Sequence, residues 1–549
     1  MKTTLLTSLG LTLRLGAGLA LLCPLPEAAA QLPTAPTKVW DRRFGGTSTT
    51  CSGEDALFTL AATPDGGCLL GGRSSSDAVG DVSQPNWAFG ADFWAVKVDA
   101  QGNKQWDARF GGTQIETLQA ILPTADGGYL LGGSSDSGQD GDKSQPSQGG
   151  NDFWLVKVNA QGVKQWDKRY GGPGSDYLAA IQPTPDGGYL LGGSSQSGSG
   201  GDKTEASRGS SDLWVVKIDA QGAKLWDHRF GGSAEEYFAG MKATPDGGCI
   251  LGGSSLSGLG GDKSEPSHGS VDIWLVKLDA TGTKQWDKAL GGAGFDGLGA
   301  IQVLPGGGYL LGGNSQSNIG DDKSDPHKGG GDMWLLRVDA QGTKLWDRTY
   351  GGAMGESITS LALMPDGGYL LAGSSSSGVG GDKTEPSQGD GDYWAVKTDA
   401  AGVKQWDKRF GGTLNDNLLA VQLAVGGDVL LGGFTASPIG GDKTQGCWGN
   451  VDYWVVKMTA GAPLAAQPAV AAQVGLYPNP ARHQVTVRLP AAYAQQPVAV
   501  TVHNALGQLL RRTALTPTGT VPLDGLAPGV YEVRLALREG VVSKKLVIE

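Results

Sequence analysis

The chain has 549 residues, and 92 of them are glycine, which is about a sixth of the total and well above the usual ~7%. Charged residues make up only 18%, so the composition indicates a turn-rich β protein and excludes a disordered polyelectrolyte. The formal net charge of −11 excludes nucleic acid as an expected partner, because neutralising phosphates requires a basic face.

Residues 1–30 predict a signal peptide that is removed on export. A basic start is followed by an apolar run from Leu15 to Leu22 and by the small residues Ala28, Ala29 and Ala30. Lipidation at Cys23 is the alternative, and we reject it because a lipoprotein signal normally has a small residue where Leu22 stands. No other apolar run is long enough to cross a bilayer, so we expect no membrane span in the mature chain.

A repeat of 60 residues organises most of the chain. One set of tryptophans precedes Asp, at Trp40, Trp106, Trp166, Trp226, Trp286, Trp346 and Trp406. A second set lies in Asp-x-Trp triplets, at Trp94, Trp154, Trp214, Trp274, Trp334, Trp394 and Trp454. Each set has seven members, and we interpret both as packing between the copies. A repeat of this length with four short β runs is typical of a β-propeller blade, so the sequence predicts an all-β, seven-bladed β-propeller.

The copy over residues 176–232 defines the blade. Its strands are predicted at Leu178–Thr184, Tyr189–Ser195, Asp212–Asp219 and Ala223–Phe230, and they are called A to D from the inside of the ring outwards. Short Gly-containing turns join A to B and C to D, whereas the B–C loop is long. The B–C loops and the D-to-A connections therefore share one side of the propeller, which we call the loop face and expect to be the working surface.

The two ends of the repeat array explain how the ring closes. The seventh copy stops after the strand at Asp452–Lys457, without a strand D. A strand D without its own blade lies near the other end of the chain, at Lys38–Gly46. We therefore expect the propeller to occupy residues 31–459, with the N-terminal strand completing the last blade.

Acidic residues recur at three positions on the expected loop face. One set precedes strand A and should form a carboxylate ring at the mouth of the central channel, and from it we take Asp176, Glu236, Asp296 and Glu356 as candidate ligand-binding residues. Asp residues also recur in the Gly-Asp-Lys motif of the B–C loop and at the start of strand C. Because a structural residue is needed in every copy, turn and strand capping is the first interpretation.

Calcium binding is the second interpretation of these acidic residues. The densest oxygen cluster is Asp136, Asp140, Asp142 and Ser144 in the second B–C loop, and Ca²⁺ prefers several oxygen ligands from one loop. The cluster lacks the Glu that closes an EF-hand loop. Ca²⁺ is therefore the one cofactor that the sequence offers, and no cofactor is certain.

Two tryptophans and two cysteines stand out because they lie outside the regular repeat. Trp87 and Trp448 are in the B–C loops of blades 1 and 7, where exposed rings could stack on a ligand or pack locally. Cys51 and Cys447 lie beside the ring closure, and in an exported protein we predict a disulfide between them. Cys68 and Cys249 are three blades apart, so we expect buried thiols.

No catalytic residues are predicted. The five histidines are scattered over different repeat positions and form no Ser-His-Asp, Cys-His or metal-binding pattern. A carboxylate pair for glycoside hydrolysis stays open, because a face rich in Asp and Glu always offers such pairs.

The C-terminal part changes character and resembles a known family. Residues 460–473 read as a linker and residues 474–549 as a small β-sandwich. The segments Leu476–Pro480, Asn504–Gln508, Leu526–Tyr531 and Lys544–Ile548 resemble, in order, the motifs of the C-terminal sorting domain, type A, of type IX secretion cargo. This resemblance implies an Ig-like β-sandwich, contact with the type IX secretion machinery, and a secreted or outer-surface location.

The propeller has weaker resemblances. The run Asp219–Trp226 is similar to the tryptophan-docking motif of quinoprotein propellers, and the whole repeat is similar to Gly-rich propellers of uncharacterised function on type IX cargo. We therefore expect a binding or scaffold module for a glycan or a surface protein. The alternative is a secreted polysaccharide hydrolase or lyase that uses the carboxylate-rich loop face.

Overall fold

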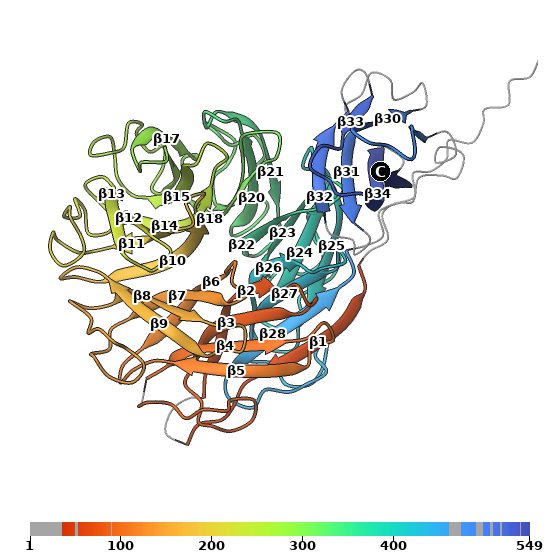
Figure 1. Ribbon diagram of the computed structural model, residues 1–549. Coiled ribbons are helices and arrows are strands. Elements are labelled where there is room, and N and C mark those ends of the chain that lie inside the picture. The colour runs from red at the N-terminus through yellow and green to blue at the C-terminus, as the bar shows by residue number, and fades with distance from the viewer. Residues whose placement is uncertain are drawn as a thin grey trace, which may run out of the picture. The chain divides into compact units, whose positions relative to one another are not determined.

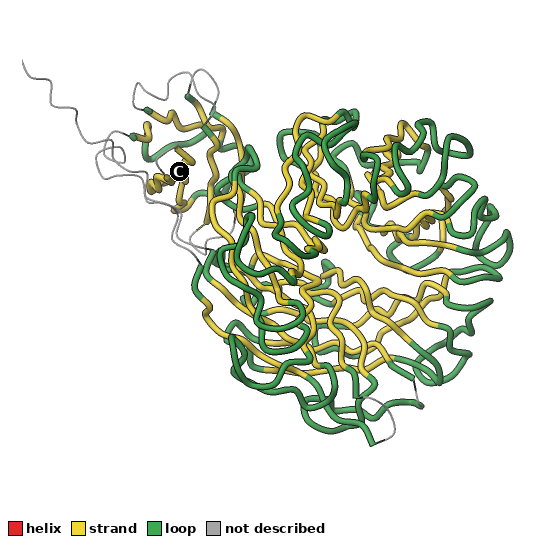
Figure 2. Tube along the Cα trace, turned by 180° about the vertical axis from the view of Figure 1, so that it is seen from behind, coloured by secondary structure: helices red, strands yellow, loops and turns green. Residues whose placement is uncertain are grey.

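The computed structural model describes residues 36–49, 53–88, 90–460, 474–489, 498–504, 509–515, 519–537 and 540–549. The predicted signal peptide and residues 461–473 of the predicted linker lie outside these ranges. Strands and loops make up the whole described chain, as Figure 2 shows by their yellow and green tubes. None of the described residues forms a helix that is long and apolar enough to cross a membrane.

Seven four-stranded antiparallel sheets form the blades of a β-propeller, as predicted (Figure 1). Blade 1 is β2 (Asp55–Ala62), β3 (Cys68–Ser74), β4 (Asp92–Val98) and β5 (Lys104–Phe110); blade 2 is β6 (Glu116–Pro123), β7 (Tyr129–Ser135), β8 (Asp152–Val158) and β9 (Lys164–Tyr170); blade 3 is β10 (Asp176–Pro183), β11 (Tyr189–Ser195), β12 (Asp212–Ile218) and β13 (Lys224–Phe230). Blade 4 is β14 (Glu236–Ala243), β15 (Cys249–Ser255), β16 (Asp272–Leu278) and β17 (Lys284–Leu290); blade 5 is β18 (Asp296–Val303), β19 (Tyr309–Ser315), β20 (Asp332–Val338) and β21 (Lys344–Tyr350). Blade 6 is β22 (Glu356–Leu363), β23 (Tyr369–Ser375), β24 (Asp392–Thr398) and β25 (Lys404–Phe410); blade 7 is β26 (Asp416–Leu423), β27 (Val429–Thr435), β28 (Asp452–Met458) and β1 (Lys38–Phe44).

The seventh blade joins the two ends of the repeat array, which confirms the predicted closure. β1 pairs with β28 in the antiparallel ladder, so the N-terminal strand is the outermost strand of blade 7. The innermost strand of blade 7, β26, contacts β2 of blade 1. The Tyr453 hydroxyl on β28 also donates a hydrogen bond of 2.9 Å to the carbonyl oxygen of Trp94 in blade 1. The ring is therefore closed by backbone pairing and by side-chain packing.

The core lies between neighbouring blades. In every blade the third strand is almost wholly buried, because sheets pack against both of its faces. In blades 1, 2, 6 and 7 the residue before this tryptophan is aromatic, and its ring meets the tryptophan of the next blade, as for Phe153 and Trp214, whose centroids are 4.8 Å apart. These contacts confirm that the strand C tryptophans pack between blades.

The short turns opposite the loop face are stabilised by their own acidic residues. In the C–D turn of blade 3, a carboxylate oxygen of Asp219 accepts hydrogen bonds from the backbone N–H groups of Gln221 and Ala223, at 2.9 and 2.8 Å. Gly222 in the same turn has φ = 82°, which only glycine adopts without strain. The turn chemistry thus follows the sequence pattern closely.

A separate small β-sandwich follows the propeller in the chain. One sheet is β29 (Gly475–Tyr477), β30 (Gln484–Arg488) and β33 (Thr520–Pro522); the other is β32 (Leu509–Ala514), β31 (Ala499–Asn504), β34 (Gly529–Leu537) and β35 (Gly540–Ile548). Alternate apolar residues, including Val485, Val500 and Val533, form its core. This is the two-sheet arrangement expected from the alternating pattern.

Candidate functional site

The Asp of each Gly-Asp-Lys motif clamps neighbouring blades together on the loop face. Asp202 in blade 3 accepts a hydrogen bond of 3.3 Å from the backbone N–H of Gly171, which follows the outer strand of blade 2. The other blade junctions repeat this contact, at Gly45–Asp81, Gly111–Asp142, Gly231–Asp262, Gly291–Asp322, Gly351–Asp382 and Gly411–Asp442. The recurring Asp therefore has a structural task at every junction.

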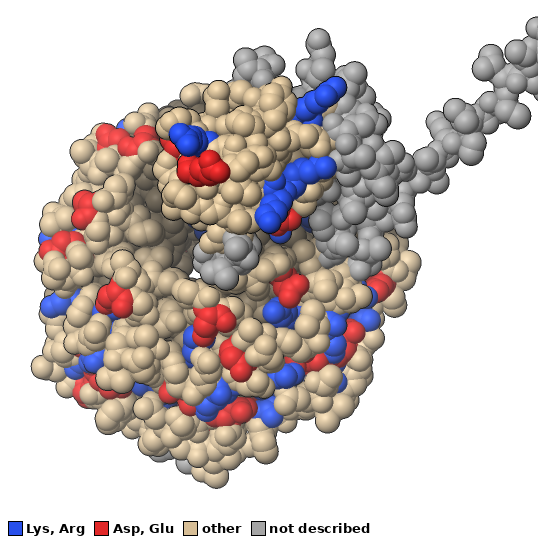
Figure 3. Space-filling model, turned by 45° about the vertical axis from the view of Figure 1, so that its right-hand side comes forward, with Lys and Arg blue, Asp and Glu red and all other residues tan. Residues whose placement is uncertain are grey.

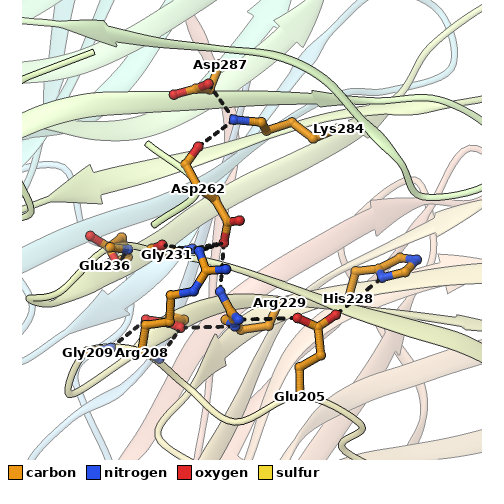
Figure 4. Close-up of polar contacts among 12 residues, drawn as sticks. Glu205, Arg208, Gly209, His228, Arg229, Gly231, Glu236, Asp262, Lys284 and Asp287 are labelled. Atoms are coloured by element: carbon orange, nitrogen blue, oxygen red, sulfur yellow. Dashed lines mark hydrogen bonds and ion pairs between the residues drawn. The ribbon is translucent and has the colours of Figure 1, made fainter. Parts of the chain in front are cut away.

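Figure 4 shows this clamp between blades 3 and 4. Asp262 accepts from Arg229, at 2.7 Å, and from Arg208, at 2.9 Å, while Arg229 also reaches Glu205. Lys284 donates to the backbone oxygen of Asp262. The carboxylate is thus neutralised by guanidinium groups of the preceding blade. On the face shown in Figure 3, acidic and basic side chains are likewise interspersed, with broad uncharged areas between them.

The Lys of the same motif is buried inside its own loop. In blade 2 the Lys143 ammonium donates to the Ser135 and Ser147 hydroxyls and to the Ser137 carbonyl oxygen, at 2.7 to 2.9 Å. Burial lowers the pKa of Lys143. The motif therefore holds the B–C loop from within, and its charge does not face a ligand.

Blade 1 has Val82 in place of this Lys, and Arg109 takes over its acceptors. The Arg109 guanidinium donates to the carbonyl oxygens of Ser74 and Ser76, which correspond to Ser135 and Ser137 of blade 2. It also lies 3.0 Å from Asp92, with both side chains buried. The arginine thus supplies from strand D the cation that the loop lacks.

The candidate carboxylates before strand A lie inside the blade junctions. The Asp176 carboxylate accepts from the backbone N–H of Gly172 and from the Ser197 hydroxyl, both at 2.8 Å. Glu236, Asp296 and Glu356 accept from the equivalent Gly N–H groups, and all four side chains are buried. As placed, these buried carboxylates hold the blade junctions together from within.

A second buried carboxylate lies close to the acid that begins strand A. It belongs to the Asp at the start of the third strand of the preceding blade. A Cβ on Gly111 would lie 2.1 Å from an oxygen of Asp92 and 2.8 Å from an oxygen of Glu116, so both acids crowd around this glycine. Burial raises the pKa of Asp92 to about 7, and the charge of Glu116 adds to this rise. Burial also raises the pKa of Asp152 to about 7 and that of Asp392 and Asp452 to about 6. These pairs make the junctions sensitive to pH.

The candidate calcium ligands are engaged in turn and loop contacts. Asp136 accepts from the backbone N–H of Ile115, at 2.9 Å, and Asp140 accepts from both the N–H and the hydroxyl of Thr113. Ser144 donates its N–H to Asp167. Over the described residues, no group of three or more His, Cys, Asp and Glu is placed to hold a metal ion. The structure thus does not bring these ligands together.

Trp87 and Trp448 are exposed, at 53% and 51%, and they occupy the same repeat position. Each lies six residues after the clamp Asp, which in the other blades places Gln148, Arg208, His268, Lys328 and Gln388 there. Trp87 donates its indole N–H to Asp142 of the next blade, at 3.0 Å. Trp448 stacks on Arg43, whose guanidinium carbon is 5.0 Å from the ring centroid. Aligning the loops on Gly-Asp would have revealed this shared position in the sequence.

The cysteines differ in their surroundings. Cys68 and Cys249 are free and buried, as expected. The Cys447 thiol donates to the Thr435 carbonyl oxygen, at 3.2 Å. Its predicted partner Cys51 lies outside the described residues, so the disulfide stays a prediction.

An arc of exposed aliphatic side chains, which the sequence analysis missed, runs over the loop face. The tip of the B–C loop carries Val79, Leu259, Ile319, Val379 and Ile439, with exposed fractions of 46 to 70%. These residues belong to blades 1, 4, 5, 6 and 7, which are consecutive around the closed ring. Leu259, Ile319, Val379 and Ile439 share one repeat position, where blades 1, 2 and 3 have Ala78, Gln139 and Ser199, and Val79 lies one residue further along its own loop. Because such groups recur at the loop tips of neighbouring blades, this part of the loop face is a candidate contact surface.

A pocket of about 410 Å³ opens between the inner ends of blades 5, 6 and 7. Its lining side chains are Phe295, Asn314, Ser315, Gln316, Glu356, Ser357, Ser374, Ser376, Asn415 and Asn417, and glycine backbone completes it. These residues flank the starts of β18, β22 and β26 and the ends of β19 and β23, so the pocket belongs to the loop face. The repeat pattern indicated the acids at these strand starts, but their amide neighbours do not recur from blade to blade and gave no such signal.

Residues 475–549 match the family of secretion system C-terminal sorting domains. The chain is a cargo of type IX secretion. The cargo is thus exported to the cell surface or the extracellular space, and its tail addresses the type IX machinery. Both statements confirm what the tail motifs predicted.

One curated protein and several solved structures are similar to this type IX cargo over most of its length. The regulatory protein FlaEY of Caulobacter vibrioides is 26% identical over 415 residues, which cover 66% of this chain and 42% of that protein. The chain thus spans less than half the length of this curated relative. Among solved structures, hydrazine synthase of Kuenenia stuttgartiensis has a TM-score of 0.35 at 11% identity, covering 78% of this chain and 95% of that one. Drosophila plexin A, in complex with semaphorin 1b, has a TM-score of 0.38 at 10% identity, covering 78% and 88%. At these low scores we draw no argument from the structural neighbours.

Proposed function

We propose that this type IX cargo is an exported binding or scaffold module that meets its partner, a glycan or a surface protein, through the loop face. One observation carries the proposal: the frame is constant from blade to blade, whereas the side chains exposed on the loop face differ. The clamp Asp recurs in every blade, but the position six residues later holds Trp, Gln, Arg, His or Lys. Repeated frames with varied exposed residues are typical of binding surfaces.

Two features of the loop face support a partner of macromolecular size. The aliphatic arc spans five blades and would bury apolar surface on contact. Trp87 and Trp448 add two large exposed rings at neighbouring blades. The candidate carboxylates Asp176, Glu236, Asp296 and Glu356 are, by contrast, buried and engaged in hydrogen bonds of the blade junctions.

The experiment is a binding and turnover screen of the mature chain. Immobilised chain is incubated with an array of glycans and with outer-surface protein extract, and the same glycans are assayed for released reducing ends and unsaturated products. We expect binding without turnover. Product release would establish the enzyme alternative instead. A further variant tests the aliphatic arc. With Val79, Leu259, Ile319, Val379 and Ile439 all changed to Ser, the chain should lose protein capture and keep its melting temperature.

A further inference from the structure

The pocket between blades 5, 6 and 7 differs from the rest of the loop face because its lining is almost free of charge. Glu356 is the one ionisable side chain that lines it. Both Glu356 oxygens are engaged within the chain, by the Ser375 hydroxyl at 2.8 Å and by the backbone N–H of Gly352 at 2.8 Å. The pocket therefore offers neutral donors and acceptors and attracts neither anions nor cations.

Three amides distinguish this pocket from the equivalent positions of other blades. Asn415 and Asn417 flank the buried acid of blade 7, where blade 2 has Ile115 and Thr117. Asn314 stands where most blades have Ser, as at Ser374. The copies thus differ at these positions, so the amides are not required by the fold.

Asn314 shows how a binding group is added without loss of a structural contact. In neighbouring blade junctions a Ser hydroxyl accepts from a strand A backbone N–H, as Ser374 does from Leu418 at 3.1 Å. The Asn314 carbonyl oxygen accepts the equivalent bond from Ile358, at 2.7 Å. Its amide nitrogen is a further donor that the serine could not supply.

An aromatic ring lines one end of the pocket. Phe295 is 40% exposed. Each blade has a residue directly after the acid that begins strand A, and only in blade 5 is this residue a glycine, Gly297. A Cβ on Gly297 would lie 3.0 Å from the Phe295 ring, so the glycine makes room for it. The ring therefore lies against the start of strand A and is still partly exposed to the pocket.

The backbone around these groups is rigid. The Asp416 N–H donates to the Gly391 carbonyl oxygen at 2.8 Å, and the Asn415 carbonyl oxygen accepts from Ala436 at 2.9 Å. The Gln316 N–H donates to the Phe295 carbonyl oxygen at 2.9 Å. Side chains on a fixed frame lose less freedom when a ligand binds, which favours affinity.

We propose that this pocket binds an uncharged oligosaccharide, an inference that rests on and deepens the proposed binding function. Amides and hydroxyls that both donate and accept match the hydroxyl groups of sugars, and the C–H face of a pyranose ring packs on an aromatic ring. The volume of about 410 Å³ lies in the range of ~300–1,000 Å³ that is usual for small-ligand sites. An anionic glycan would find no cationic side chain in the lining. An apolar ligand would leave the amide groups of the pocket without hydrogen-bond partners.

The test compares variants in the pocket with matched variants elsewhere on the ring. The mature chain is probed on an array of uncharged β-glucans, mannans and xylans beside uronic-acid and sulfated glycans. We expect selective binding of uncharged glycans that is unchanged by added salt, since no ion pair contributes. Affinity for the strongest glycan is then measured by titration calorimetry. Phe295→Ala and Asn417→Ala should each weaken it about tenfold.

Ile115→Ala and Thr117→Ala, at the same repeat positions in blade 2, should leave that affinity unchanged. Melting temperatures identify any variant that fails to fold, and Gln316→Ala then replaces it. Uncharged-glycan binding that all pocket variants retain overturns the pocket and leaves the proposed function standing. Binding of charged glycans alone, or of no glycan on the array, overturns the ligand class, while protein capture separately decides the proposed function.

Discussion

In blade 2 the ammonium of Lys143 fills the B–C loop, whereas in blade 1 the guanidinium of Arg109 reaches the corresponding acceptors from a different strand. The exchange has a second consequence at the next junction. Arg169 of blade 2 pairs with the clamp residue Asp202, but Arg109 has turned inward and leaves Asp142 to the Trp87 indole N–H. The loss of the lysine in blade 1 is thus accompanied by two changes: Arg109 fills the loop, and Trp87 bonds to Asp142. The same positions are therefore held in both blades, but by different residue types.

The largest expected effect comes from removing Arg109, the arginine that takes the place of the loop lysine in blade 1. Arg109→Ala leaves Asp92 buried without its cation and the Ser74 and Ser76 carbonyl oxygens without their donor, which should lower the free energy of unfolding by about 3–5 kcal/mol. Arg229→Ala, at the same position in blade 3, should cost only about 1–2 kcal/mol. Lys203 still fills the loop, Arg208 still pairs with Asp262, and the lost contact with the buried Asp212 is longer, at 3.5 Å. Denaturant unfolding measures both. Equal losses would show that blade 1 is not a special case.

A second substitution should repair the first. Val82→Lys in the Arg109→Ala background restores the arrangement of blade 2 and should recover about 1–3 kcal/mol, since the Ser74 and Ser76 acceptors are in place. Val82→Lys alone should destabilise the protein, because two cations would then crowd one buried site. The same unfolding assay applies. A double variant no more stable than Arg109→Ala would contradict the equivalence of the two cations.

The buried carboxylates predict an acidic optimum of stability. Burial raises the pKa of Asp92 and Asp152 from 3.8 to about 7, so the folded state binds more protons than the unfolded state between about pH 4 and 7. Stability therefore falls as pH rises through this window. Asp107 and Asp167 have lowered pKa values because, against the opposing effect of burial, they accept hydrogen bonds from Lys104 and Lys164, and their contribution is lost as pH falls below about 4.

The measurement is the melting temperature as a function of pH. We expect a maximum near pH 4 and a value several degrees lower at pH 8. Asp92→Asn removes one titrating group and should flatten this decline, whereas Asp99→Asn, in an exposed turn, should not. A melting temperature that rises steadily from pH 5 to pH 8 would overturn the assignment of raised pKa values.

The blade frame could be predicted from the sequence because its determinants are local and recur. The period, the turn residues such as Asp219 and Gly222, and the split seventh blade all follow from spacing. The role of Asp176 could not be predicted, since its exposure depends on the Gly172 N–H and the Ser197 hydroxyl that fold over it. The sequence pattern predicted a ring of acids at the channel mouth. It did not show that groups of the chain itself would donate hydrogen bonds to these acids and bury them.

The pocket escaped prediction for a related reason. Phe295 and Asn314 belong to blade 5, whereas Asn415 belongs to blade 7, far away in the sequence, and only ring geometry brings these residues together. Trp87 and Trp448 illustrate the reverse case. They were predicted as loop residues outside the repeat, although their constant distance from Asp81 and Asp442 already placed them at one repeat position.

The smallest expected effect tests the last contact of the blade 1 exchange. Trp87→Phe keeps an aromatic ring but removes the indole N–H that bonds to Asp142, so the free energy of unfolding should fall by only about 0.5–1 kcal/mol. Trp448→Phe, at the same repeat position, should have less effect, because its contact with Arg43 needs only the ring face. Differential scanning calorimetry of the two variants makes the comparison. If Trp448→Phe proves the more damaging, the indole N–H is not what replaces the arginine at Asp142, and the clamp of blade 2 must depend on the Gly111 backbone N–H alone.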